Sequence, residues 1–120
     1  MFHVDPATKT ITMHRGDTGE MTVKARGYDF DSVDRALFTV KDDQGTEIMS
    51  RVYSMTNNQF VVEFVNADTD HLTPKTYWWD VRYVMSPTYD PVTGKIDDGD
   101  AVTTPGSPFQ LRILSTVGLI

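Results

Sequence analysis

The chain has 120 residues, a formal charge of −6 and no cysteine. This length fits one domain that can fold without a disulfide or a metal, and the lack of cysteine excludes disulfide scaffolds and thiolate zinc sites. The acidic balance argues against nucleic acid as a partner, and no segment resembles a signal peptide or is long enough to predict a membrane partner.

In chain order, short strands account for most of the sequence. Apolar and polar residues alternate with the period of two that is typical of half-buried strands. The pattern predicts strands over residues 10–14, 20–25, 36–41, 48–53, 60–64, 77–84, 101–103 and 109–114. One short helical turn is predicted near 67–72, where capping residues precede Pro74.

Many short strands separated by turns indicate an all-β fold. We predict an immunoglobulin-like β-sandwich of about seven to nine strands, formed by residues 1–120 as a single domain. A closed barrel is the alternative architecture. The long connection over residues 86–108 favours the sandwich, because the last strand must travel before it pairs. This connection is expected to contain a hairpin around residues 93–95.

Two adjacent tryptophans stand in one predicted strand. Successive side chains of a strand point to opposite faces, so only one of the two rings can enter the core. We predict that Trp79 is buried and that Trp78 lies on the outer sheet face. An indole in that position is either covered by the long connection or serves as an interface anchor. Asp80 shares the outer face and can pair with Arg82, or with Arg112 if the two strands are neighbours.

The sequence shows no phosphate-binding loop, no His-Glu-x-x-His zinc motif and no Gly-x-Ser-x-Gly motif. We therefore predict a protein that is not an enzyme and needs no cofactor. Asp97, Asp98 and Asp100 are weak candidates for a calcium site, since hard cations bind several oxygen ligands near a Gly-containing turn. The alternative is a solvated hairpin tip whose charges keep a sheet edge from aggregating.

Several short motifs occur in an order that resembles small immunoglobulin-like phage proteins, among them the N-terminal domain of baseplate upper proteins from phages of Gram-positive bacteria. These motifs are residues 10–18 (TITMHRGDT), 36–41 (ALFTVK), 68–72 (DTDHL), 77–81 (YWWDV) and 102–104 (VTT). The resemblance implies a virion or prophage structural protein that is made in the bacterial cytoplasm. It also implies contacts with other virion proteins or with further copies of the chain, and it names no catalytic residue.

Four residues are candidates for such an interface: Trp78, Arg82, Leu119 and Ile120. Aromatic and apolar groups that are not needed in the core suit assembly, because aromatic anchors dominate the energy of protein interfaces. The alternative is a module that binds carbohydrate or another cell-surface ligand, with or without calcium. In that case Trp78 and Tyr89 would provide the stacking platform.

Overall fold

The structure is a computed structural model that describes residues 2–25, 27–104 and 106–115. These residues form nine strands and one four-residue helix. The strands are β1 (His3–Val4), β2 (Ile11–His14), β3 (Gly19–Lys24), β4 (Arg35–Lys41), β5 (Glu47–Ser54), β6 (Gln59–Phe64), β7 (Thr76–Tyr89), β8 (Ile96–Thr103) and β9 (Phe109–Leu114), and the helix is α1 (Asn66–Thr69). The prediction of a mostly β chain with a short helical turn is confirmed, and the turn begins one residue before the predicted span.

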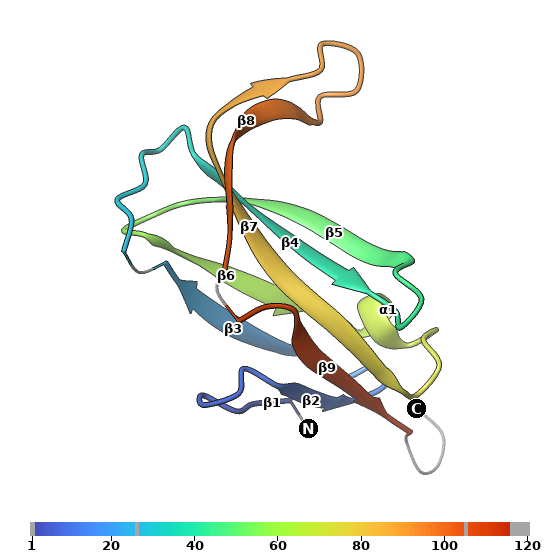
Figure 1. Cartoon of the computed structure of the whole chain (residues 1–120). Coiled ribbons are helices and arrows are strands. Elements are labelled where there is room, and N and C mark those ends of the chain that lie inside the picture. Colours follow the sequence, from blue (N-terminus) through green and yellow to red (C-terminus); the bar gives the residue numbers. More distant parts are fainter. Residues whose placement is uncertain (1, 26, 105, 116–120) are drawn as a thin grey trace.

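The strands form two sheets that face one another (Figure 1). Among the described residues, the larger sheet has the strand order β1-β2-β9-β7-β4-β5, with β8 paired to β7 beyond this path, and β3 and β6 form the smaller sheet. Neighbouring strands are antiparallel except β2 and β9, which run parallel. Two separate sheets give a sandwich-like arrangement and exclude the closed barrel that the sequence left open.

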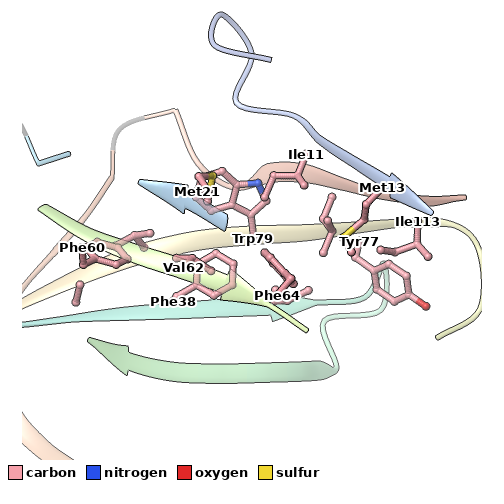
Figure 2. Packing of buried hydrophobic residues seen from close by; sticks show 14 of the residues in the cluster. Ile11, Met13, Met21, Phe38, Phe60, Val62, Phe64, Tyr77, Trp79 and Ile113 are labelled. Atoms are coloured by element: carbon pink, nitrogen blue, oxygen red, sulfur yellow. The ribbon is translucent and has the colours of Figure 1, made fainter. Parts of the chain in front are cut away.

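A hydrophobic core fills the space between the two sheets (Figure 2). Its largest fully buried rings, Phe38 and Phe64, lie with their centroids 6.0 Å apart. Trp79 is 4% exposed, and its ring lies 5.7 Å from that of Phe38 and 4.9 Å from that of Phe109. Its indole N–H donates to the carbonyl of Lys9 at 3.2 Å. The predicted core position of Trp79 is therefore confirmed.

β7 continues past the body of the sandwich and forms a long hairpin with β8, which we call the arm (residues 86–103; Figure 1). The sequence predicted a hairpin here but only a short strand over residues 101–103, whereas β8 begins at Ile96. The long strand was missed because the charged and glycine-containing residues 97–100 carry no apolar alternation. Most of the 86–108 connection therefore lies in the arm, which extends away from the body of the sandwich.

The base of the arm is bent by a bulge. Ser86 and Pro87 of β7 stand opposite Gly99 of β8, between the pairs Met85–Asp100 and Thr88–Asp98. Gly99 has a φ of +153°, and a Cβ atom there would lie 2.6 Å from Cγ1 of Val84. Because a side chain at this position would collide with the opposite strand, the bend requires glycine.

A buried carboxylate fixes this bend to the rest of the sandwich. Asp34 is 5% exposed and accepts hydrogen bonds from the backbone N–H groups of Ser86 at 2.9 Å and Asp31 at 2.7 Å. These two donors belong to segments far apart in the sequence, the base of the arm and the loop that precedes β4. Asp34 therefore holds the arm at a defined position.

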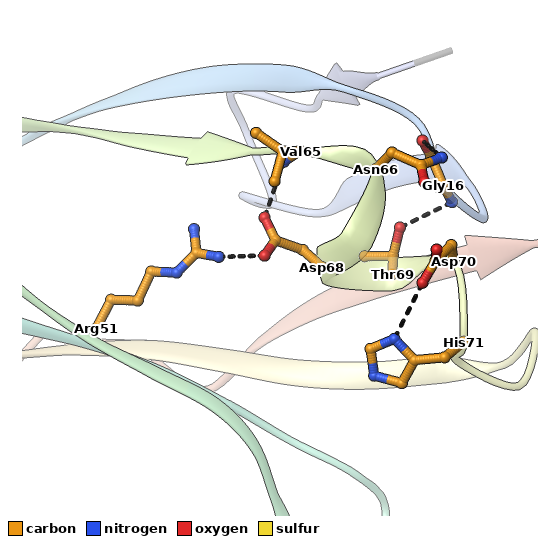
Figure 3. A network of polar contacts seen from close by, with 8 residues as sticks. All are labelled: Gly16, Arg51, Val65, Asn66, Asp68, Thr69, Asp70 and His71. Carbon is orange, nitrogen blue, oxygen red and sulfur yellow. Dashed lines mark hydrogen bonds and ion pairs between the residues drawn. The ribbon is translucent and has the colours of Figure 1, made fainter.

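Polar contacts fasten α1 between the two sheets (Figure 3). The guanidinium of Arg51 on β5 forms an ion pair with Asp68, whose other carboxylate oxygen accepts the N–H of Val65 at 2.8 Å. The hydroxyl of Thr69 accepts the N–H of Gly16 at 2.8 Å. The helix thus connects the edge of the larger sheet to the turn between β2 and β3.

Candidate binding groove on the outer sheet face

Trp78 lies on the face of the larger sheet that points away from the core. It stands between Lys41 of β4 and Gln110 of β9, its partners in the sheet. Trp78 is partly buried in this position. The alternation along β7 therefore assigns the two tryptophans to opposite faces as expected, and the surroundings of Trp78 decide what it can bind.

Trp78 lines an open groove of about 900 Å³ on this face. One wall is the turn between β1 and β2, and the other is formed by residues that precede β9. The groove is lined by His3, Asp5, Ala7, Thr8, Lys9, Thr10, Thr12, Trp78, Thr104, Gly106, Pro108, Phe109, Gln110 and Arg112. Of the described residues of the 86–108 connection, Thr104, Gly106 and Pro108 line the groove together with Trp78.

The walls of the groove are ordered by local hydrogen bonds. The carboxylate of Asp5 accepts the backbone N–H groups of Ala7 at 2.8 Å and Thr8 at 3.3 Å, which lowers the pKa of Asp5 below its ordinary value. The Arg112 Nε–H donates to the side-chain oxygen of Gln110 at 3.1 Å. The groove thus presents the aromatic rings of Trp78 and Phe109 among hydroxyl, amide and guanidinium groups. Such a set suits a ligand with both an apolar face and hydrogen-bonding groups.

The four predicted interface residues have different surroundings. Trp78 lines the groove, and Arg82 is exposed on the same sheet face, opposite Leu37 of β4. Leu119 and Ile120 lie outside the described residues. The structure therefore places two of the four candidates on one face of the sheet.

Neither of the two pairings that the sequence allowed for Asp80 is formed among the described residues. Within the part of the chain that the structure describes, Asp80 forms an ion pair neither with Arg82 nor with Arg112. Arg112 is directed to Gln110 instead, since both side chains lie on the same face of β9 two residues apart.

Gln110 and Arg112 were not singled out as groove residues from the sequence. A signal was present, because the apolar positions of β9 alternate with these two polar ones. The turn between β1 and β2 had no comparable signal, since its place beside Trp78 depends on the order of the strands in the sheet. Sequence reasoning could therefore have found the β9 residues of the groove but not the turn between β1 and β2.

The three aspartates proposed as calcium ligands lie along β8. The ladder with β7 is irregular here: Asp98 pairs with Thr88 and Ile96 pairs with Tyr89, which leaves Asp97 as an extra residue between them. The carboxylate of Asp98 accepts the backbone N–H of Gly99 at 2.8 Å. In residues 2–25, 27–104 and 106–115, no group of three or more His, Cys, Asp or Glu side chains is arranged to hold a metal ion.

We expect calcium to leave the melting temperature of the chain unchanged to within about 1 °C, because an ion that does not bind the folded state preferentially cannot stabilise it. Thermal melts with calcium chloride, with magnesium chloride as a control and with a chelator would measure this. A melting temperature that rises with calcium alone, and no longer does so in Asp98→Asn, would contradict the geometry of β8.

Comparisons with protein-family models, with curated proteins and with solved structures find no match to this chain. Among the described residues, no helix is both long and apolar enough to cross a membrane.

Proposed function

We propose that this chain is a non-enzymatic structural or assembly module of a phage or prophage virion, located in a tail or baseplate and acting through contacts with other proteins. The phage assignment rests on the motif order described above. The observation that carries the binding role is the outer sheet face, where Trp78 lines a groove beside the exposed Arg82. Aromatic residues and arginine are the residue types that contribute most energy at protein interfaces.

The finer fold assignment is also part of the proposal. An immunoglobulin-like sandwich is supported by the pairing of β3 with β6 opposite a sheet that contains β9, β7, β4 and β5. The buried Trp79 near the start of β7 also supports this class, because a strand tryptophan packed in the core is typical of it. Domains of this kind are common building blocks of extended assemblies because their loops and sheet edges are free to make contacts.

The direct test is the presence of the chain in particles purified by density gradient from the host that encodes it. We expect a stoichiometric copy number by quantitative mass spectrometry. Arg82→Glu should lower incorporation severalfold without changing the melting temperature, because the exposed guanidinium contributes to contacts rather than to the fold. Arg15→Glu is the matched control, since Arg15 is also exposed but lies in the turn after β2. A chain that stays entirely in the soluble host fraction would refute the virion role.

The second candidate is a carbohydrate-binding module that uses the same groove. It is favoured by the combination of an indole with the hydroxyl groups of Thr10 and Thr12 and the amide of Gln110. Binding to host-wall glycans on an array, lost in Trp78→Ala, would support this candidate over assembly. If the folded chain binds no glycan on the array, assembly remains the preferred function.

A further inference from the structure

The sheets of this protein end in several free edges, and most of them are obstructed. Unpaired edge strands expose backbone N–H and C=O groups that can pair with another chain, so proteins block them with charges, bends or covering side chains. β8 carries three aspartates and the bend at Gly99, and β1 has only two residues. Arg51 donates to the carbonyl of Glu63 on β6, and the ring of Phe2 lies against Gly19 of β3.

β5 is the exception. It is eight residues long, contains neither proline nor lysine, and among the described residues pairs only with β4. Its one charged side chain near the middle, Arg51, is directed to β6 and α1 and leaves the edge open. Val52 is 51% exposed on the outer face, next to Leu37 of β4. The edge thus has the length and the apolar surface to accept another strand.

The hydrogen-bond ladder shows which residues of β5 face the free edge. The N–H groups of Thr104 and Ile113 donate to the carbonyls of Val81 and Lys75, each at 3.0 Å. The backbone groups of the odd-numbered residues of β7 therefore face β8 and β9. In an antiparallel ladder the backbone N–H and C=O groups of successive residues point to alternate sides of the strand, so the even positions of β7 face β4. Their partners in β4 are odd positions, and the even positions of β4 therefore face β5. The register then directs the odd positions of β5 to β4 and its even positions, 50, 52 and 54, to the free edge.

We propose that β5 pairs antiparallel with β5 of a second copy of this chain, with a two-fold axis at Val52. In this register the backbone groups that face the edge meet those of the partner, and Val52 lies opposite the partner's Val52. Ser50 lies opposite the partner's Ser54. On the inner face, Arg51 lies opposite the partner's Tyr53, so this register sets no like charges opposite each other. The two larger sheets would continue as one sheet across the dimer.

The alternative registers are less complementary. A two-fold axis at Arg51 would place two guanidinium groups directly opposite each other, which is destabilising in a sheet. An axis at Ser50 would place Val52 opposite the partner's Ile48, which lies at the irregular point of the ladder with β4 and packs against its own core. The axis at Val52 also joins the outer-face residues Val52, Leu37 and Arg82 of both copies into one continuous row. Self-complementarity therefore selects the register centred on Val52.

This inference names a partner and a contact surface for the proposed assembly role, but it concerns the purified chain and does not require a virion. Sedimentation and light scattering of the wild-type protein should show a dimer. Val52→Lys should raise the dissociation constant at least about tenfold, because it places two ammonium groups opposite each other. The matched control is Val61→Lys on β6, where the valine is 43% exposed but lies on the smaller sheet; this variant should still dimerise.

The register has its own test. The chain contains no cysteine, so Val52→Cys introduces a single thiol, which should form a disulfide-linked dimer on mild oxidation because opposite strand positions lie within disulfide range. Val61→Cys should remain largely monomeric under denaturing conditions. The β5 contact is overturned if the wild-type chain is monomeric at roughly 1 mM, or if the two lysine variants dimerise equally well. Neither result bears on the virion proposal, which has its own test.

Discussion

Replacement of Trp79 by alanine is expected to lower the free energy of unfolding by roughly 3–5 kcal/mol, among the largest single effects in this protein. The ring is almost completely buried between Phe38 and Phe109, and its N–H bonds the carbonyl of Lys9. Removal of the indole leaves a cavity and an unpaired carbonyl. Urea denaturation followed by circular dichroism would measure the loss.

The adjacent tryptophan is the matched control. Trp78→Ala removes the same side chain from the same strand, but the ring lies on the outer face and lines an open groove. We expect it to cost less than half of the Trp79→Ala effect, because little core packing is lost. Equal losses of unfolding free energy in the two variants would contradict the assignment of the indoles to opposite faces.

Asp34→Ala is expected to lower the free energy of unfolding by about 2–4 kcal/mol. The substitution removes a buried acceptor from the backbone N–H groups of Asp31 and Ser86 and leaves both donors without their partner. Because Ser86 belongs to the bulge at the base of the arm, amide hydrogen exchange should also accelerate over residues 84–103.

Asp31→Ala provides the control for this prediction. Asp31 contributes its backbone N–H to the contact, and its exposed side chain can be removed with a change within about 0.5 kcal/mol. If exchange in the arm stays at the wild-type rate in Asp34→Ala while the fold is weakened, Asp34 stabilises the loop before β4 but does not hold the arm.

Local alternation in the sequence predicted the strands and most of the core. Ala36, Phe38 and Val40 point inward in the structure as their spacing indicated. The opposite orientations of Trp78 and Trp79 were likewise predictable, because they follow from the pleat of a single strand. The virion role remains a prediction that the particle analysis tests. The absence of enzymatic activity and the immunoglobulin-like class also remain predictions.

Sequence alone thus determined the strands of the sandwich body from β2 to β7 and β9, and which side of each is apolar, since both depend on neighbours in the chain. It did not determine β1 or the length of the arm. Only the tertiary structure decided which strands lie side by side. It brought the turn after β1 beside Trp78, directed the carboxylate of Asp34 to Ser86 and left β5 at an open edge. These features depend on sheet order and register, which arise from pairing between segments distant in the sequence and are not encoded in any local period.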